Sequence, residues 1–290
     1  MLKTAVLMTA MTALLGVVGI ALAGFEGLIM ALILAMGLNF FAWYNSDKVI
    51  LKIYDAKQVD TSHNIYQMVD NLSRNADLPT PKVYVIESNQ PNAFATGRNP
   101  ENGAVAITTG LLKRLNKNEI IAVIAHELAH IKNRDTTIMV ITATFAGAIS
   151  LLANFAMFFG NRRQGGIGII GIIAMMILAP MAASIIQMAI SRSREYKADK
   201  LGSEICGNPM WLASALKNIQ SSANKIDNYK AEQNPSTAHM FIINPLHAHR
   251  HDKLFSTHPS TANRILELEK LTKLIKPKNK RRISSIPKVG

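Results

Sequence analysis

The sequence contains four long stretches without a charged side chain, and these constrain the fold more than any other feature. They cover residues 4–23, 27–44, 138–160 and 167–190. Each is close to the roughly 20 residues that an apolar helix needs to cross a lipid bilayer. One such stretch alone is compatible with a buried core helix, but four of them, arranged as two consecutive pairs, predict two transmembrane hairpins. We therefore expect an integral membrane protein.

The first apolar segment also shares features with a cleaved signal peptide. Lys3 precedes it, and an Ala-x-Ala pattern ends it at Ala23. Its apolar core is nevertheless longer than the roughly 7–15 residues of a signal core. A second apolar segment also follows almost at once. We therefore expect residues 1–46 to remain in the protein as an anchoring hairpin.

The basic residues predict how the spans are oriented. Of the 32 lysines and arginines, all except Lys3, Arg162 and Arg163 lie in the polar segments 45–137 and 191–290. Positive charge concentrates on the cytoplasmic side of membrane proteins, which places both termini and both polar segments in the cytoplasm. Arg162 and Arg163 lie in the loop on the opposite side, but two basic residues there do not outweigh the much larger number in the polar segments.

The C-terminal end carries much of the formal net charge of +13, because no acidic residue follows Glu269. On a soluble protein such a basic tail favours nucleic-acid binding. Beside a membrane, attraction to anionic lipid headgroups is the better interpretation. We expect the tail to contact the bilayer and expect no nucleic-acid partner.

The stretch "AVIAHELAHIKNRD", residues 122–135, predicts a metal site on a helix. His126 and His130 stand four residues apart and so share one helical face. Asn116 is suited to cap this helix, with Glu119 reaching back to it. Two imidazoles at this spacing can bind one zinc ion, with Glu127 beside them to take a proton from the attacking water. Zinc is therefore the expected cofactor.

A third ligand has to come from elsewhere in the chain. A histidine at position 136 would complete a metzincin pattern, but Thr136 occupies it. The second predicted hairpin returns the chain to the same membrane face at "SRSREYKAD", which brings Glu195 close to His130. Asp199, one turn later, is suited to support a liganding histidine. Glu204 is the next candidate ligand, and a surface ion pair with nearby basic residues is the alternative role for Glu195 and Asp199.

The motifs "HELAHIKNRD" and "SREYKAD", separated by a transmembrane hairpin, resemble those of the HtpX-type membrane zinc metalloproteases, relatives of the CAAX prenyl proteases. The resemblance covers the whole chain. It implies a gluzincin site with one zinc ion on His126, His130 and Glu195, Glu127 as general base, and Asp199 in support. It also implies a bacterial inner-membrane enzyme with a cytoplasmic active site that degrades misfolded or damaged membrane proteins.

The expected fold is a mainly α integral membrane protein with four transmembrane helices and a zincin-like α+β cytoplasmic catalytic domain. The catalytic domain is split in sequence by the second hairpin. We expect an N-terminal transmembrane hairpin (1–46) followed by the first part of the catalytic domain (47–137). The second hairpin (138–190) then precedes the second part of the catalytic domain (191–269) and the basic tail (270–290).

The region before the zinc helix predicts a place for the substrate. Val83–Ile86 is a short apolar run, while Asn92–Thr96 and Ala104–Thr108 flank a turn rich in Gly, Asn and Pro, as in a β-hairpin. A sheet edge can hold an extended peptide without demanding a sequence. Since the resembled family has an "NAFA" stretch here, the candidate substrate-binding residues are Asn92, Ala93, Phe94 and Ala95. The alternative is an ordinary packed hairpin.

Two residues near the C-terminus are further candidates. His258, in "FSTHPSTANRILELEKL", is a candidate donor to the oxyanion that forms when water attacks the peptide carbonyl. The alternative is a turn with Ser260 or Thr261 capping the next helix. Arg264 on that helix is placed to pair with a site carboxylate. The alternating histidines of residues 247–251 do not share a helical face and are expected to form a polar loop.

Three other functions are less compatible with the sequence. An intramembrane protease is disfavoured because charged residues flank the window 120–131, which is too short to span a bilayer. The zinc helix should therefore lie against the bilayer rather than within it. The four apolar segments hold no ionisable side chain, whereas channels and transporters usually carry such groups in their spans. A zinc-binding scaffold without proteolytic activity would not need Glu127.

Overall fold

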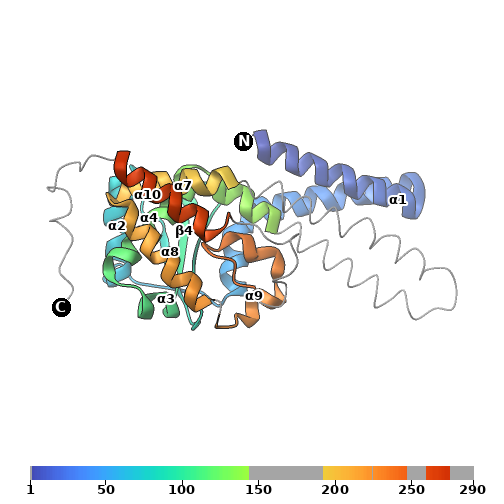
Figure 1. Cartoon of the computed structure of the whole chain (residues 1–290). Coiled ribbons are helices and arrows are strands. Elements are labelled where there is room, and N and C mark those ends of the chain that lie inside the picture. The colour runs from blue at the N-terminus through green and yellow to red at the C-terminus, as the bar shows by residue number, and fades with distance from the viewer. Residues whose placement is uncertain (1, 144–191, 224, 247–258, 275–290) are drawn as a thin grey trace.

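The computed structural model describes residues 2–143, 192–223, 225–246 and 259–274, and this part of the chain is mostly helical around one small sheet (Figure 1). Its helices are α1 (Leu2–Ile53), α2 (Asn64–Asn75), α3 (Thr109–Arg114), α4 (Lys117–Lys132), α7 (Arg192–Cys206), α8 (Pro209–Ala223), α9 (Tyr229–Gln233) and α10 (Thr261–Leu274), with the 3-10 helices η1 (Pro100–Asn102) and η2 (Pro235–Met240). Residues 135–143 are also helical. The strands are β1 (Lys57–Gln58), β2 (Lys82–Ile86), β3 (Ala93–Thr96) and β4 (Ala104–Thr108).

Helix α1 doubles back on itself, so the first two apolar segments form the predicted hairpin (Figure 1). The reversal lies at Gly24, whose φ of +58° is in the left-handed region that glycine adopts at little cost. The amide of Asn39 donates to the Thr12 hydroxyl at 2.9 Å, although 27 residues separate the two. Between the arms, a Cβ at Gly19 would lie 2.6 Å from that of Ala31, so small residues allow the close approach.

Evidence for membrane crossing is confined to this hairpin. Within the described part of the chain, one helical stretch, Gly24–Phe41, is long and apolar enough to cross a membrane, and 17% of it is buried. It covers most of the predicted second span, and the predicted first span is helical in the other arm. The predicted third span beyond residue 143 and the whole of the fourth lie outside the described residues. Four spans therefore stay a prediction.

The sheet places β3 at an edge. The strand order is β1-β2-β4-β3, with β2 parallel to β4 and the other two pairs antiparallel. The predicted hairpin of β3 and β4 is confirmed, and Ala95 pairs with Val105 in it. The parallel pairing of β2 with β4 was not predicted, because it joins two segments that are not adjacent in sequence. One edge of β3 is thus directed away from the rest of the sheet.

The two faces of the sheet pack against different parts of the chain. One face, with Val105 and Ile107, contributes to a core shared with α2, α4, α7 and α8. The other face, with Phe94 and Ala106, packs against the end of α1, the helical residues 139–143 and the α9–η2 region. The sheet therefore joins the buried helix α4 on one side to the end of α1 on the other.

Helix α4 starts as the sequence predicts. The Asn116 side chain accepts from the Glu119 N–H, and the Glu119 carboxylate accepts from the Asn116 N–H, each at 3.0 Å. Glu119 also accepts hydrogen bonds from Ser214 and Asn218 of α8. One carboxylate thus caps α4 and joins it to α8, which sets where the zinc motif begins.

Candidate metal centre

Helix α4 directs the two motif histidines toward one point. His126 and His130 are buried on the same face of the helix, and their Nε2 atoms are 3.1 Å apart. Glu127, between them in sequence, is also buried. The predicted pairing of two imidazoles with a neighbouring carboxylate is therefore present in the folded chain.

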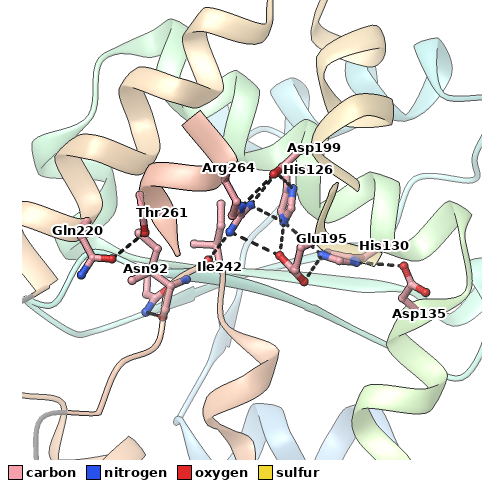
Figure 2. A network of polar contacts seen from close by, with 11 residues as sticks. Asn92, His126, His130, Asp135, Glu195, Asp199, Gln220, Ile242, Thr261 and Arg264 are labelled. Atoms are coloured by element: carbon pink, nitrogen blue, oxygen red, sulfur yellow. Dashed lines mark hydrogen bonds and ion pairs between the residues drawn. The ribbon is translucent and has the colours of Figure 1, made fainter. Parts of the chain in front are cut away.

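Glu195 of α7 completes the group (Figure 2). Its carboxylate oxygens lie 3.6 Å from His126 Nε2 and 3.5 Å from His130 Nε2. The closeness expected from the return of the chain after the second hairpin is thus found. Glu204, the other candidate ligand, is exposed on α7.

Glycine allows α7 to approach α4 this closely. A Cβ at Gly202 would lie 2.9 Å from both the N and Cα atoms of His126, a distance that Cβ atoms essentially never show. The backbones of the two helices therefore meet at the residue that carries the first ligand. Any side chain at position 202 would push Glu195 and His126 apart.

These residues fit a zinc ion. One ligand atom from each of His126, His130 and Glu195 can be chosen so that all lie within 4.8 Å of one another. Two nitrogens and one oxygen make the donor set of a catalytic zinc site, which leaves a coordination position open. Among the described residues, the buried Oε1 of Glu127 has no hydrogen-bond partner, as expected for a group that faces a reacting molecule.

The charges around the site also favour a cation. Burial by itself lowers the pKa of His130, but the carboxylates of Glu195 and Asp135 outweigh it and raise that pKa to about 9. The surroundings of His130 thus favour positive charge, which a divalent metal supplies in place of the proton. Burial raises the pKa of Glu127 to about 7, and a nearby cation would lower it again and keep this carboxylate ready to accept a proton.

Asp199 and Arg264 position the His126 ring through polar contacts. The Asp199 carboxylate lies 3.0 Å from His126 Nδ1, in the position predicted for it. Arg264 of α10 donates to both oxygens of Asp199, at 2.9 and 2.6 Å, and its Nη1 lies 3.4 Å from Glu195. Burial would raise the pKa of Asp199, but Arg264 outweighs it and holds that pKa below its ordinary value. Arg264 therefore pairs with two site carboxylates.

His130 has a carboxylate partner that the sequence analysis missed. The Nδ1 atom of His130 lies 3.2 Å from an oxygen of Asp135. The chain turns after α4 at Arg134, whose φ is +59°, and this brings Asp135 back beside the helix. A metal-binding histidine usually donates its other N–H to a carboxylate, so an acid five residues after His130 was a usable signal.

The candidate substrate-binding residues lie next to the site, but not all of them face it. The backbone N–H of Ala95 is near enough to Glu127 to lower the pKa of this carboxyl, so the outer edge of β3 passes beside it. Asn92, Ala93 and Phe94 are buried as well. The Asn92 amide donates to the carbonyl of Ile243 at 2.9 Å, so its side chain holds a neighbouring segment.

His258 and the histidines of residues 247–251 lie outside the described residues, and their predicted roles stay predictions. The cap proposed for the following helix is present, since the Ser260 hydroxyl accepts from the Asn263 N–H at 3.2 Å.

A buried H-E-x-x-H helix, a glutamate from a second helix and an edge strand beside Glu127 together form the arrangement of a metallopeptidase site. The model of peptidase family M48 matches residues 60–272, and the chain belongs to this family. The crystal structure of Ste24p from S. mikatae is similar in fold, with a TM-score of 0.52 and 20% sequence identity. The match covers 93% of this chain and 65% of Ste24p, so the chain spans somewhat less than two thirds of that protein.

Proposed function

We propose that the chain is a zinc-dependent endopeptidase that hydrolyses misfolded or damaged membrane proteins at the cytoplasmic face of a bacterial inner membrane. The observation that carries this proposal is the convergence of His126, His130 and Glu195 around one point, with Glu127 beside them at a strand edge. Membership of a peptidase family supports hydrolysis of peptide bonds.

The chain's own residues suit this chemistry. When bound to the three ligands, zinc would polarise the scissile carbonyl and lower the pKa of the attacking water. Glu127 would take the proton from that water and return it to the leaving amine. The edge of β3 would hold the peptide backbone, which makes binding largely independent of the substrate's sequence. Such tolerance suits a quality-control protease.

The position at a membrane is supported by the helical hairpin of α1. Large apolar side chains on it, including Phe25, Met30, Ile33 and Phe40, are exposed in the folded chain. Lipid would cover them in a bilayer. We propose unfolded or damaged membrane proteins as substrates, and anionic lipids as contacts of the basic residues 270–290. Removing these residues should weaken binding to anionic vesicles at low salt.

The test is a cleavage assay on the full chain, purified in detergent under a chelator. Zinc is added back to the wild type and to Glu127→Ala, and cleavage of unfolded casein is followed on a gel. Zinc-dependent fragments from the wild type alone would establish the protease and its general base. Fragments from both would indicate a contaminant. Bound zinc without fragments from either would favour the alternative, a zinc-binding membrane scaffold.

A further inference from the structure

Residues 241–243 lie along the outer edge of β3 as an additional short strand. Phe241 pairs with Phe94 in an antiparallel bridge. The N–H of Ile242 donates to the carbonyl of Ala93 at 3.0 Å. The Asn92 amide donates to the Ile243 carbonyl. The edge proposed to receive a substrate is therefore already paired with the chain itself.

This internal strand reaches the metal ligands through Arg264 (Figure 2). The Nη1 atom of Arg264 donates to the Ile242 carbonyl at 2.9 Å and lies 3.4 Å from Glu195 Oε2. Nη2 of the same guanidinium is 3.4 Å from His126 Nε2. A single side chain thus joins the backbone of the internal strand to two of the three ligands.

The internal strand runs antiparallel to β3. The Ala95 N–H is near enough to Glu127 to lower its pKa, and Ala93 is two residues, or about 7 Å, further along β3. From Phe241 to Ile243 the strand moves away from the general base. A substrate running in this direction would place the residues that follow its cleaved bond where 241–243 lie.

The edge of β3 is also occupied on the other side of Ala95. The Thr136 hydroxyl donates to the carbonyl of Gly97 at 2.9 Å. Backbone groups on both sides of Ala95 are therefore bonded to the chain itself, so an extended substrate of several residues cannot pair with β3 in this arrangement.

We propose that residues 241–243 act as an internal pseudosubstrate, which restrains the protease and leaves the β3 edge before a substrate binds there. This inference rests on the proposed function, because it concerns the same site. Displacing this segment breaks the backbone bonds above and the edge-to-face contacts of Phe241 with Phe94 and Tyr54, each with ring centroids 5.1 Å apart. It also exposes the three buried side chains, of which Ile242 and Ile243 pack in the core around α4 and Phe241 in the core on the other face of the sheet. All the polar contacts of the internal strand with the edge use its backbone, as those of substrates of varied sequence would.

The variant that tests this is Ile242→Pro, which removes the N–H that bonds to Ala93. Phe241 already has the extended conformation that a residue before proline adopts, with φ −80° and ψ 150°. Ile242→Val is the matched control, because it keeps the donor and the β-branched shape. Both are made in a Glu127→Gln background, loaded with zinc as full chains in detergent. The probe is a fluorescein-labelled peptide with the sequence of residues 238–246, followed by anisotropy.

We expect Ile242→Pro to bind the peptide about two- to tenfold more tightly than Ile242→Val, since one backbone hydrogen bond no longer holds the edge closed. With Glu127 restored, the KM for unfolded casein should fall by a similar factor. Equal or weaker peptide binding would overturn the proposal. If Ile242→Pro does not fold, Phe241→Ala, which removes the ring contacts and keeps the backbone donors, is judged by the same criterion.

This experiment distinguishes failure of the proposed protease function from failure of the proposed pseudosubstrate. If the proline variant binds the peptide more tightly but no variant cleaves casein with zinc, the internal strand is supported and the protease is not. If zinc-loaded enzymes cleave casein but Ile242→Pro neither binds nor cleaves better than Ile242→Val, the protease stands and the internal strand is a fixed part of the sheet.

Discussion

The two histidines of the metal centre are held in different ways. The partner of His130 is Asp135, five residues along the chain, with the two atoms 3.2 Å apart. The partner of His126 is Asp199 from α7, which is itself held by Arg264 from α10. One half of the centre is therefore formed by local structure, while the other half exists only after three helices have packed together.

This difference shows which part of the site depends on local folding and which part depends on tertiary packing. The His130 half needs only the end of α4 and the turn at Arg134. The His126 half buries two carboxylates and a guanidinium, so its members depend on one another. We therefore expect substitutions in the His126 half to have larger effects on both stability and metal binding.

The largest effect should come from Arg264→Met. It removes the guanidinium that pairs with the buried Asp199 and Glu195, and breaking a buried ion pair lowers the free energy of unfolding by about 3–5 kcal/mol. Denaturation of the zinc-free chain in detergent measures this. The control is Arg74→Met, which breaks the exposed pair with Asp70 and should cost less than about 1 kcal/mol. Equal losses would show that Arg264 is not essential to the fold of the site.

The next comparison removes the charge from each histidine partner. Losing such a carboxylate weakens metal binding by about 10–100-fold, and we expect Asp199→Asn near the upper end and Asp135→Asn near the lower end. The reason is that Asp199→Asn also disturbs Arg264, which contacts Glu195 and His126, whereas Asp135→Asn affects His130 and the neighbouring Arg194. Competition with a chromophoric zinc chelator measures both affinities. The reverse order would contradict the difference between the two halves.

Gly202→Ala should separate α7 from α4. Its Cβ would lie 2.9 Å from the His126 backbone, and overpacking of this kind costs about 1–3 kcal/mol. We expect a lower melting temperature and weaker zinc binding together. Gly37→Ala in α1 is the control, because nothing lies within 4 Å of a Cβ there. Unchanged zinc binding in Gly202→Ala would mean that the helices can separate without moving the ligands.

The smallest effect should come from Asn116→Ala, which removes the cap of α4. Loss of an N-cap lowers the free energy of unfolding by about 1 kcal/mol. Zinc affinity should hardly change, since the cap lies ten residues before His126. Asn116→Ser keeps a capping oxygen and should retain most of the stability. A large drop in zinc affinity for the alanine variant alone would show that the cap positions the ligands.

Local features of the fold and the site were predictable from the sequence. The cap of α4 and the pairing of His126 with His130 follow from residue spacings within one helix. The β3–β4 hairpin and the reversal of α1 at Gly24 follow from a turn between two regular segments. In each case the interacting residues are close in sequence, so their pattern specifies their contact.

The contacts between segments that are distant in sequence were harder to predict. The closeness of Glu195 was predicted from chain topology, and Arg264 was predicted to contact a carboxylate without its two partners being known. The parallel pairing of β2 with β4 and the strand at 241–243 were not predicted. A hydrogen bond such as that from Ile242 to Ala93 uses only backbone atoms, which leave no mark in the sequence.

The sequence by itself determined the chemical identity of the site: His126, Glu127 and His130 at a helical spacing that suits zinc, on a chain with four long apolar segments. The tertiary structure decided how Arg264 neutralises the buried acids and what lies on the edge of β3. Helical spacing places residues within one turn of each other, whereas these contacts depend on how α4, α7, α10 and the sheet pack.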